Sequence, residues 1–140
     1  MSKGTSIVPA SKEATMWVRI VTALAALVSA AVHLYLWFDG FRDIDKIGPA
    51  FMVNAMAGAV ITVLLMTWRH WIPAFLVLGF GASTLGAFIV SSTVGLFGVN
   101  EQWTGGWVLS AAASELVCIL GGLALLRPVL ARRRSAALTR

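Results

Sequence analysis

The most conspicuous shortage in this chain is charge. Only 12% of its 140 residues are Asp, Glu, Lys or Arg, and 59% are hydrophobic. Soluble domains carry about 25% charged residues, so this composition excludes an ordinary soluble fold. Apart from Arg127, which ends the last of them, the long apolar stretches contain only two charged side chains, Arg19 and Glu115. The stretches are residues 17–38, 48–68, 71–97 and 106–127.

Residues that build common catalytic and metal sites are equally scarce. Cys118 is the single cysteine, which excludes an intrachain disulfide and a cysteine-rich zinc site. His33 is the one histidine inside an apolar stretch, which does not favour a bis-histidine haem held by one chain. The sequence has no Walker loop, dinucleotide fingerprint or nucleophile elbow. It therefore identifies no catalytic residue, no metal site and no cofactor.

What the chain does contain is four segments long enough to cross a bilayer. At 1.5 Å per residue, a helix of about 20 residues spans a hydrocarbon layer about 30 Å thick. We therefore expect an all-α fold, a four-helix transmembrane bundle with up-down-up-down topology, over residues 16–128. Residues 1–15 are expected to be disordered, Pro128 is expected to end the last helix, and 129–140 form a basic tail.

Basic residues are distributed unevenly between the two predicted sides of the bundle. One side holds nine of them and the other only Arg42 and Lys46. The nine are Lys3, Lys12, Arg19, Arg69, Arg127, Arg132, Arg133, Arg134 and Arg140. The positive-inside rule therefore predicts a multi-pass protein of the cytoplasmic (inner) membrane with both termini cytoplasmic. Arg132, Arg133 and Arg134 are expected to contact anionic lipid headgroups, and no nucleic-acid partner is expected.

Small residues recur every four positions in the last two apolar stretches. Helices in a bilayer associate where small side chains allow close backbone approach, so such series predict contact faces. We expect these two faces to form a tight helix pair, and Ala87→Leu to disrupt folding or assembly. The faces are Gly79, Ser83, Ala87, Ser91 and Gly95 in the third stretch, and Ser110, Ser114, Cys118 and Gly122 in the fourth.

Three polar side chains fall at similar depths in three of the stretches: His33, Asn54 and Glu115. Glu115 lies about 12 Å below Trp107 along a helix, where a charged group is costly and is expected to face the bundle interior. One interpretation is that the three fix helix packing through hydrogen bonds. The other is that they line an outward-opening pocket that binds a ligand.

The segment after the first stretch carries a recognisable pattern. His33-Leu34-Tyr35-Leu36-Trp37 is followed by Gly40-Phe41-Arg42 and by Ile44 and Ile47-Gly48. The pattern resembles small uncharacterised four-span integral membrane proteins of actinobacterial type, which carry no assigned activity, so it implies no site residues. Phe41, Ile44 and Ile47 also recur every three residues, which predicts a short helical turn lying on the membrane surface.

With almost no mass outside the membrane, the chain favours a non-enzymatic role. We expect an accessory or assembly component that contacts lipids and either a membrane protein partner or further copies of itself. The first alternative is a small transporter-like or ligand-binding bundle that uses His33, Asn54 and Glu115. The second is a subunit of a membrane redox enzyme that contributes to a quinone site.

Overall fold

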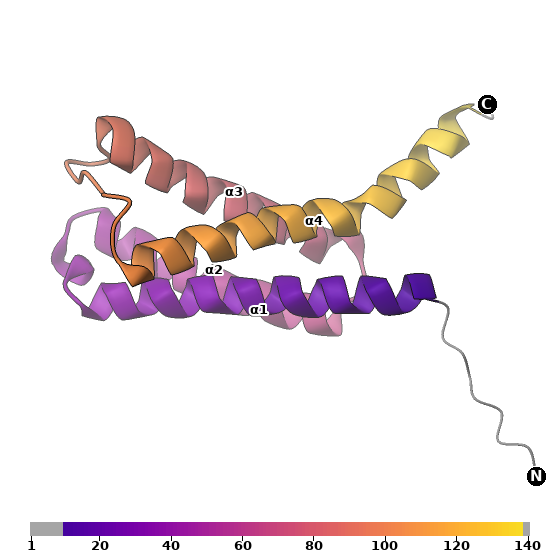
Figure 1. Ribbon diagram of the computed structural model, residues 1–140, viewed down its shortest axis with the longest axis horizontal. Helices are drawn as coiled ribbons and strands as arrows, with labels where there is room; N and C mark the ends of the chain where they lie inside the picture. Colours follow the sequence, from indigo (N-terminus) through magenta and orange to yellow (C-terminus); the bar gives the residue numbers. More distant parts are fainter. Residues whose placement is uncertain (1–9, 139–140) are drawn as a thin grey trace, which may run out of the picture.

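The computed structural model describes residues 10–138. Over this range the chain forms four α-helices and one 3-10 turn. These are α1 (Ala10–Phe38), η1 (Phe41–Asp43), α2 (Ile47–Thr67), α3 (Trp71–Val94) and α4 (Gly106–Leu138). All four α-helices are long and apolar enough to cross a membrane. Figure 1 shows the connections 39–46 and 95–105 at one end of the bundle, and the described ends of the chain at the other.

Helix α1 begins earlier than the sequence analysis expects. It starts at Ala10, so the part of the predicted disordered segment that the structure describes is helical, and residues 1–9 lie outside the described range. Lys12, Glu13 and Ala14 are good helix formers, and Glu13 lies in the first turn, where an acidic side chain favours the helix dipole. The transmembrane helix therefore extends beyond its apolar stretch.

Helix α4 continues through Pro128, which does not end it as expected. Proline removes one backbone donor and crowds the carbonyl four residues earlier, here that of Ala124, which bends a helix without always stopping it. Figure 1 shows the C-terminal part of α4 turned away from the axis of its first part. The turns beyond Pro128 are rich in Ala, Leu and Arg, which favour helix. Of the three arginines expected at headgroups, Arg134 is exposed, and the side chains of Arg132 and Arg133 lie outside the described residues.

Helices α2 and α3 are joined by three residues, Trp68–His70, and hydrogen bonds from α1 hold this connection in place. The Arg19 guanidinium donates hydrogen bonds to the carbonyls of Leu65 at 3.1 Å and Trp68 at 2.7 Å. Leu65 lies in the last turn of α2 and Trp68 caps its end, where carbonyls have no helical donors. The His70 ring accepts from the backbone N–H of Ile72 and so caps α3. The guanidinium of a half-buried arginine on α1 thus satisfies carbonyls at one end of a neighbouring helix.

The half of the bundle next to Trp68–His70, called here the packed half, is closed by glycines. A Cβ atom on Gly58 of α2 would lie 2.9 Å from the Ala26 carbonyl oxygen of α1. One on Gly81 of α3 would lie 2.6 Å from the Glu115 carbonyl oxygen of α4. The core between these contacts is also built from small and medium side chains. It comprises Ala23, Ala25, Ala26, Ile61, Leu65, Ala74, Val77, Phe80, Cys118 and Leu125.

The expected α3–α4 pair forms, but α3 uses a different face. Cys118 and Gly122 of α4 do contact α3, against Gly81 and against Leu78 and Ala74. Gly79 faces open space, Ser83 and Ala87 line a cavity, and Gly95 lies beyond the end of α3 with φ +82°. Ser91 bonds to the loop that follows α3, while Ser110 and Ser114 bond back to carbonyls of α4 itself. A four-residue series drifts around a helix of 3.6 residues per turn, so five members do not stay on one contact face.

The opposite half, called here the cavity half, is looser. Figure 1 shows α3 diverging from α4 toward the end that carries the 95–105 connection. Helices α2 and α3 contact each other far less than α1 contacts α2 or α3 contacts α4. The η1 turn folds onto this half: Phe41 stacks on Phe51 with ring centroids 4.8 Å apart, and Ile47 is buried. Two of the three apolar side chains expected on the membrane surface therefore pack onto the bundle.

Candidate functional site

A cavity of about 440 Å³ occupies the cavity half of the bundle. Residues of all four α-helices, of η1 and of the loop after α3 line it, and most of the lining is apolar. Its polar side chains come from all four α-helices and from the loop after α3. They are His33, Asn54, Ser83, Thr84, Ser91, Glu101 and Glu115. The structure thus brings His33, Asn54 and Glu115 to one space, as the pocket interpretation requires.

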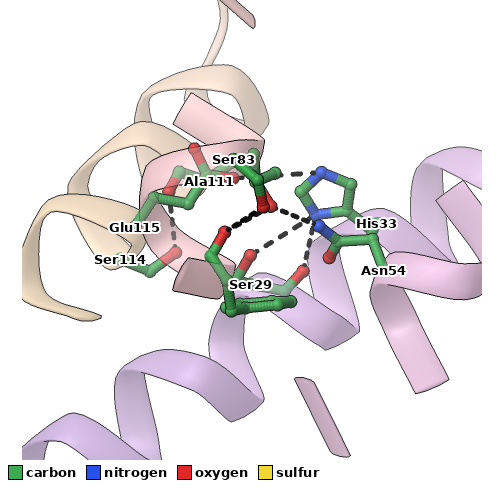
Figure 2. A network of polar contacts seen from close by, with 9 residues as sticks. Ser29, His33, Asn54, Ser83, Ala111, Ser114 and Glu115 are labelled. Carbon is green, nitrogen blue, oxygen red and sulfur yellow. Dashed lines mark hydrogen bonds and ion pairs between the residues drawn. The ribbon is translucent and has the colours of Figure 1, made fainter. Parts of the chain in front are cut away.

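His33 is 8% exposed and its ring is fixed in place by α1 itself. The ring Nδ1 atom lies 2.8 Å from the Ser29 carbonyl oxygen one turn earlier, and Figure 2 shows this contact. Because a carbonyl oxygen only accepts hydrogen bonds, Nδ1 must carry a proton. The other ring nitrogen, Nε2, therefore points away from α1 and toward α4. In the neutral ring that nitrogen is a hydrogen-bond acceptor.

Glu115 is 2% exposed and faces His33 from α4. Its Oε1 atom lies 3.9 Å from His33 Nε2, and the Ser29 hydroxyl also interacts with its carboxyl group. A bare ring nitrogen facing a carboxylate is repulsive, so one proton belongs between the two groups. With that proton on either partner, the pair carries no net charge, which is the arrangement a bilayer interior favours. The separation is too long for a direct hydrogen bond.

Asn54 supplies the third polar group from α2. Its Nδ2 donates to the Thr84 hydroxyl of α3 at 2.7 Å, and that hydroxyl donates in turn to the Phe80 carbonyl at 2.8 Å. The Thr84 proton is thus committed, which fixes the amide with its nitrogen toward Thr84. The amide oxygen, Oδ1, is buried and has no hydrogen-bond partner. A buried acceptor without a donor costs about 1 to 3 kcal/mol, so this oxygen marks a place where a donor is missing.

Aromatic rings line the side of the cavity formed by η1 and α2. Phe41 stacks on Phe51, and Phe51 also contacts the His33 ring at a centroid distance of 5.0 Å. From the sequence, Phe41 is expected on the membrane surface and Phe51 has no expected role. Three-residue spacing reports only that Phe41 shares a face with Ile44 and Ile47, and not whether that face meets lipid or protein.

The loop after α3 forms the rim of the cavity. Leu96 and Val99 pair across a turn whose central residues, Phe97 and Gly98, have positive φ values of 49° and 83°. The Ser91 hydroxyl donates to the Val99 carbonyl and accepts from the Glu101 N–H, which anchors this turn to α3. Burial raises the pKa of the Glu101 carboxyl above its ordinary value. Glu101 was not predicted to be a site residue, because nothing in its sequence surroundings distinguishes it from a solvated loop charge.

Among residues 10–138, no group of three or more His, Cys, Asp or Glu side chains is placed to hold a metal ion. Cys118, in the packed half, is buried and free. The polar groups at the cavity are instead a proton-sharing pair and an unpaired amide oxygen. This combination suits hydrogen bonding to an organic molecule better than coordination of a cation.

Comparison of the chain with protein-family models, with curated proteins and with solved structures gives no match.

Proposed function

We propose that the protein is a small multi-pass protein of the cytoplasmic membrane that binds a small molecule in its cavity and catalyses no reaction. The observation that carries the proposal is the convergence of His33, Asn54 and Glu115, from three helices, on one cavity of about 440 Å³. Ligand sites are typically cavities of about 300 to 1,000 Å³ with mostly apolar walls and a few placed polar groups. The cavity has this size and this lining.

Incomplete pairing of the polar groups favours binding over a purely structural role. Side chains that only fix helix packing are expected to satisfy one another. Here His33 Nε2 and Glu115 Oε1 are held 3.9 Å apart, and Asn54 Oδ1 has no partner. The first departure leaves hydrogen-bonding capacity in the wall of a cavity of ligand size, and the second leaves an unpaired buried acceptor on a residue of the same wall.

We also propose an orientation of the bundle in the membrane. With nine basic residues predicted on one side and two on the other, an up-down-up-down bundle with both termini in the cytoplasm satisfies the positive-inside rule. The packed half then lies in the cytoplasmic leaflet and the cavity half in the outer leaflet. Cysteine labelling from each side of the membrane, at position 3 and at position 43, tests this orientation. Labelling of both positions from the same side would contradict it.

The binding function is tested by filling the cavity. The full chain is purified in a mild detergent, and native mass spectrometry detects small molecules that remain bound. Ala111→Phe places a ring in the cavity, whereas Ala113→Phe places the same ring on the exposed face of α4. We expect a bound molecule with the wild type and with Ala113→Phe, and none with Ala111→Phe. A wild-type protein without any bound molecule, or equal retention by both variants, would contradict the proposal.

Assembly with another membrane helix is a second candidate, because the backbone of α3 is open to approach. Gly79 and Gly86 have no atom within 4 Å of the position that a Cβ would take. Exposed small residues on a membrane helix favour close contact with a partner helix or a second copy. In-membrane crosslinking from position 82 would report such a neighbour, and Gly79→Leu should abolish the crosslink. Absence of any crosslinked chain in the native membrane would count against this candidate.

A further inference from the structure

The space between His33 and Glu115 always offers one donor and one acceptor. Nδ1 is committed to the Ser29 carbonyl, so one proton remains for Nε2 and the Glu115 carboxyl together. If the proton is on Glu115, the carboxyl group donates and Nε2 accepts. If it is on His33, Nε2 donates and the carboxylate accepts. A ligand atom that bridges the two groups from beside this 3.9 Å gap must therefore both accept and donate.

A hydroxyl group meets this requirement, and ether, ester, ketone, ammonium and carboxylate groups do not. An ether, ester or ketone oxygen only accepts, which leaves the acceptor of the pair without a partner. An ammonium group only donates and adds a charge that the neutral pair does not compensate. A carboxylate adds an uncompensated negative charge beside Glu115. The pair therefore selects a neutral alcohol or phenol.

Asn54 strengthens the same selection. Its amide orientation is fixed by the chain of hydrogen bonds from Nδ2 to Thr84 and from Thr84 to Phe80. What remains is the acceptor Oδ1, which lacks a donor. A second donor on the headgroup reaches this atom only if the amide turns, because less than 1 Å² of Oδ1 is exposed. The cavity therefore lacks a donor at Asn54 and a group that both donates and accepts at His33 and Glu115.

The walls of the cavity indicate where the ligand comes from. Val53 lines the cavity and is also 65% exposed on the outer surface of α2, among residues that face acyl chains in a bilayer. Ala50, one turn away, has both properties too. Over their whole length, helices α2 and α3 contact each other less than α1 contacts α2 or α3 contacts α4. The cavity is thus continuous with the lipid-facing surface beside α2, through apolar side chains.

We infer that the ligand is a neutral, hydroxyl-bearing amphiphile dissolved in the membrane, with its hydroxyl between His33 and Glu115 and its apolar part directed past Val53 toward lipid. This inference rests on the proposed binding function and specifies its ligand class. Long-chain and isoprenoid alcohols belong to this class, and so does a quinol. A quinone does not, so a quinone site of the kind expected from the sequence would hold the reduced form.

The experiment compares two probes that differ by one methyl group. Farnesol carries a hydroxyl, and farnesyl methyl ether carries an oxygen that only accepts. Binding of each is measured with the full chain in lipid nanodiscs, by competition against a radiolabelled farnesol. We expect farnesol to bind about tenfold or more tightly than the ether, because a site built around a hydroxyl leaves polar groups unpaired when the hydroxyl is absent. The comparison needs no substitution and does not depend on the folding of any variant.

Two substitutions locate the selectivity. Glu115→Leu replaces the carboxyl group with an apolar side chain of similar size, and we expect it to bind farnesol no more tightly than the ether. Ser114→Ala is the matched control, because Ser114 bonds to its own helix at the Ala111 carbonyl and does not line the cavity. It should keep the wild-type preference. Loss of the preference in Ser114→Ala but not in Glu115→Leu would overturn the assignment.

The remaining outcomes separate the two proposals. If both probes bind the wild type equally, and Ala111→Phe abolishes both, the cavity binds ligands but the hydroxyl inference is wrong. A third outcome is that neither probe binds, but the wild type retains another molecule that Ala111→Phe does not retain. The hydroxyl inference is then wrong, and the proposed binding function stands. If nothing binds and no molecule is retained, the proposed function itself fails.

Discussion

The two halves of this bundle use small and polar residues in opposite ways. In the packed half, glycines bring helix backbones together, and polar side chains such as Thr62 and Arg19 are bonded to carbonyls of neighbouring helices. In the cavity half, small side chains such as Ser83 and Ala87 line an open space, and Asn54 Oδ1 has no partner. The same residue types thus pack and pair in one half of the bundle, whereas in the other half they line a cavity and leave one polar atom unpaired.

The difference shows which polar residues contribute to folding. A membrane interior supplies no water to a polar group that lacks a partner. Polar groups that stabilise the fold are therefore hydrogen-bonded, and an unpaired polar group lowers the stability of the fold. The packed half follows this rule. The cavity half departs from it at a space of ligand size, and such departures are where function is expected.

The largest effect is expected at Gly81, where the backbones of α3 and α4 are in contact. A Cβ at this position would meet the Glu115 carbonyl oxygen at 2.6 Å and the Cys118 Cβ at 3.0 Å, so neither backbone nor side chain can move aside cheaply. We expect Gly81→Leu to cost about 3 kcal/mol or more and to abolish a monodisperse, folded protein. Gly79→Leu is the control, because Gly79 faces open space. Fluorescence-detected gel filtration of both variants measures this, and equal behaviour would show that α3 and α4 do not meet at Gly81.

This contrast also shows what the sequence predicts and what it does not. The helices follow from their apolar stretches, and Cys118 and Gly122 are recognisable on the face of α4 that contacts α3. The face of α3 that contacts α4 cannot be recognised in the sequence. Gly79 and Gly81 are both small residues in an apolar helix, and only tertiary packing decides which one meets α4. The helical start at Ala10 and the bend at Pro128 likewise depend on propensities too weak to set a boundary.

Only some residues of the candidate site can be predicted from the sequence. His33, Asn54 and Glu115 are conspicuous because polar residues are rare in the apolar stretches. Phe51, Thr84 and Glu101 are not conspicuous, since an aromatic or hydroxyl residue is common in a membrane helix and an acid is common in a loop. Their places at the cavity follow from the divergence of α3, which no local pattern encodes.

The second prediction concerns Ala87, which the sequence analysis places in a helix contact. The structure places Ala87 on the cavity wall, so Ala87→Leu should fill empty space and not disrupt the bundle. We expect thermal stability to be unchanged or slightly raised and ligand retention to fall about tenfold or more. Ala82→Leu, on the exposed face of α3 and away from the cavity, should change neither property. If Ala87→Leu unfolds, Ala87 lies in a helix contact, as expected from the sequence, and not on the wall of a cavity.

A pair of substitutions compares hydrogen bonds in the two halves. Thr62→Val in the packed half removes a hydroxyl whose proton is shared between the Gly58 carbonyl of α2 at 2.8 Å and the Ala23 carbonyl of α1 at 3.1 Å, and should lower stability by about 0.6 kcal/mol. Asn54→Leu in the cavity half loses one hydrogen bond but also removes an unpaired acceptor, so stability should stay level or rise by about 1 kcal/mol. Unfolding in mixed micelles with increasing denaturing detergent measures both. Greater destabilisation by Asn54→Leu would mean that the cavity half holds the fold together.

The smallest effect is a pH dependence confined to the rim of the cavity. Burial raises the pKa of Glu101 above its ordinary value of 4.5, so the folded loop keeps a proton that the released loop loses. The stability from this proton is fully present below the ordinary value and is lost as pH rises through the raised folded value. Hydrogen exchange of residues 96–101, corrected for its intrinsic pH dependence, should therefore show weaker protection as pH rises through this window.

Glu101→Gln removes the titrating group and keeps a side chain of similar size, so protection of the loop should no longer change with pH. Residues 58–67 of α2, in the packed half, contain no titratable side chain, and their corrected exchange should stay constant over the same window. The effect is small because Glu101 is only partly buried, and solvent screens the carboxyl group. Protection that strengthens as pH rises would mean that the ionised carboxylate, not the protonated acid, is the form that the rim of the cavity stabilises.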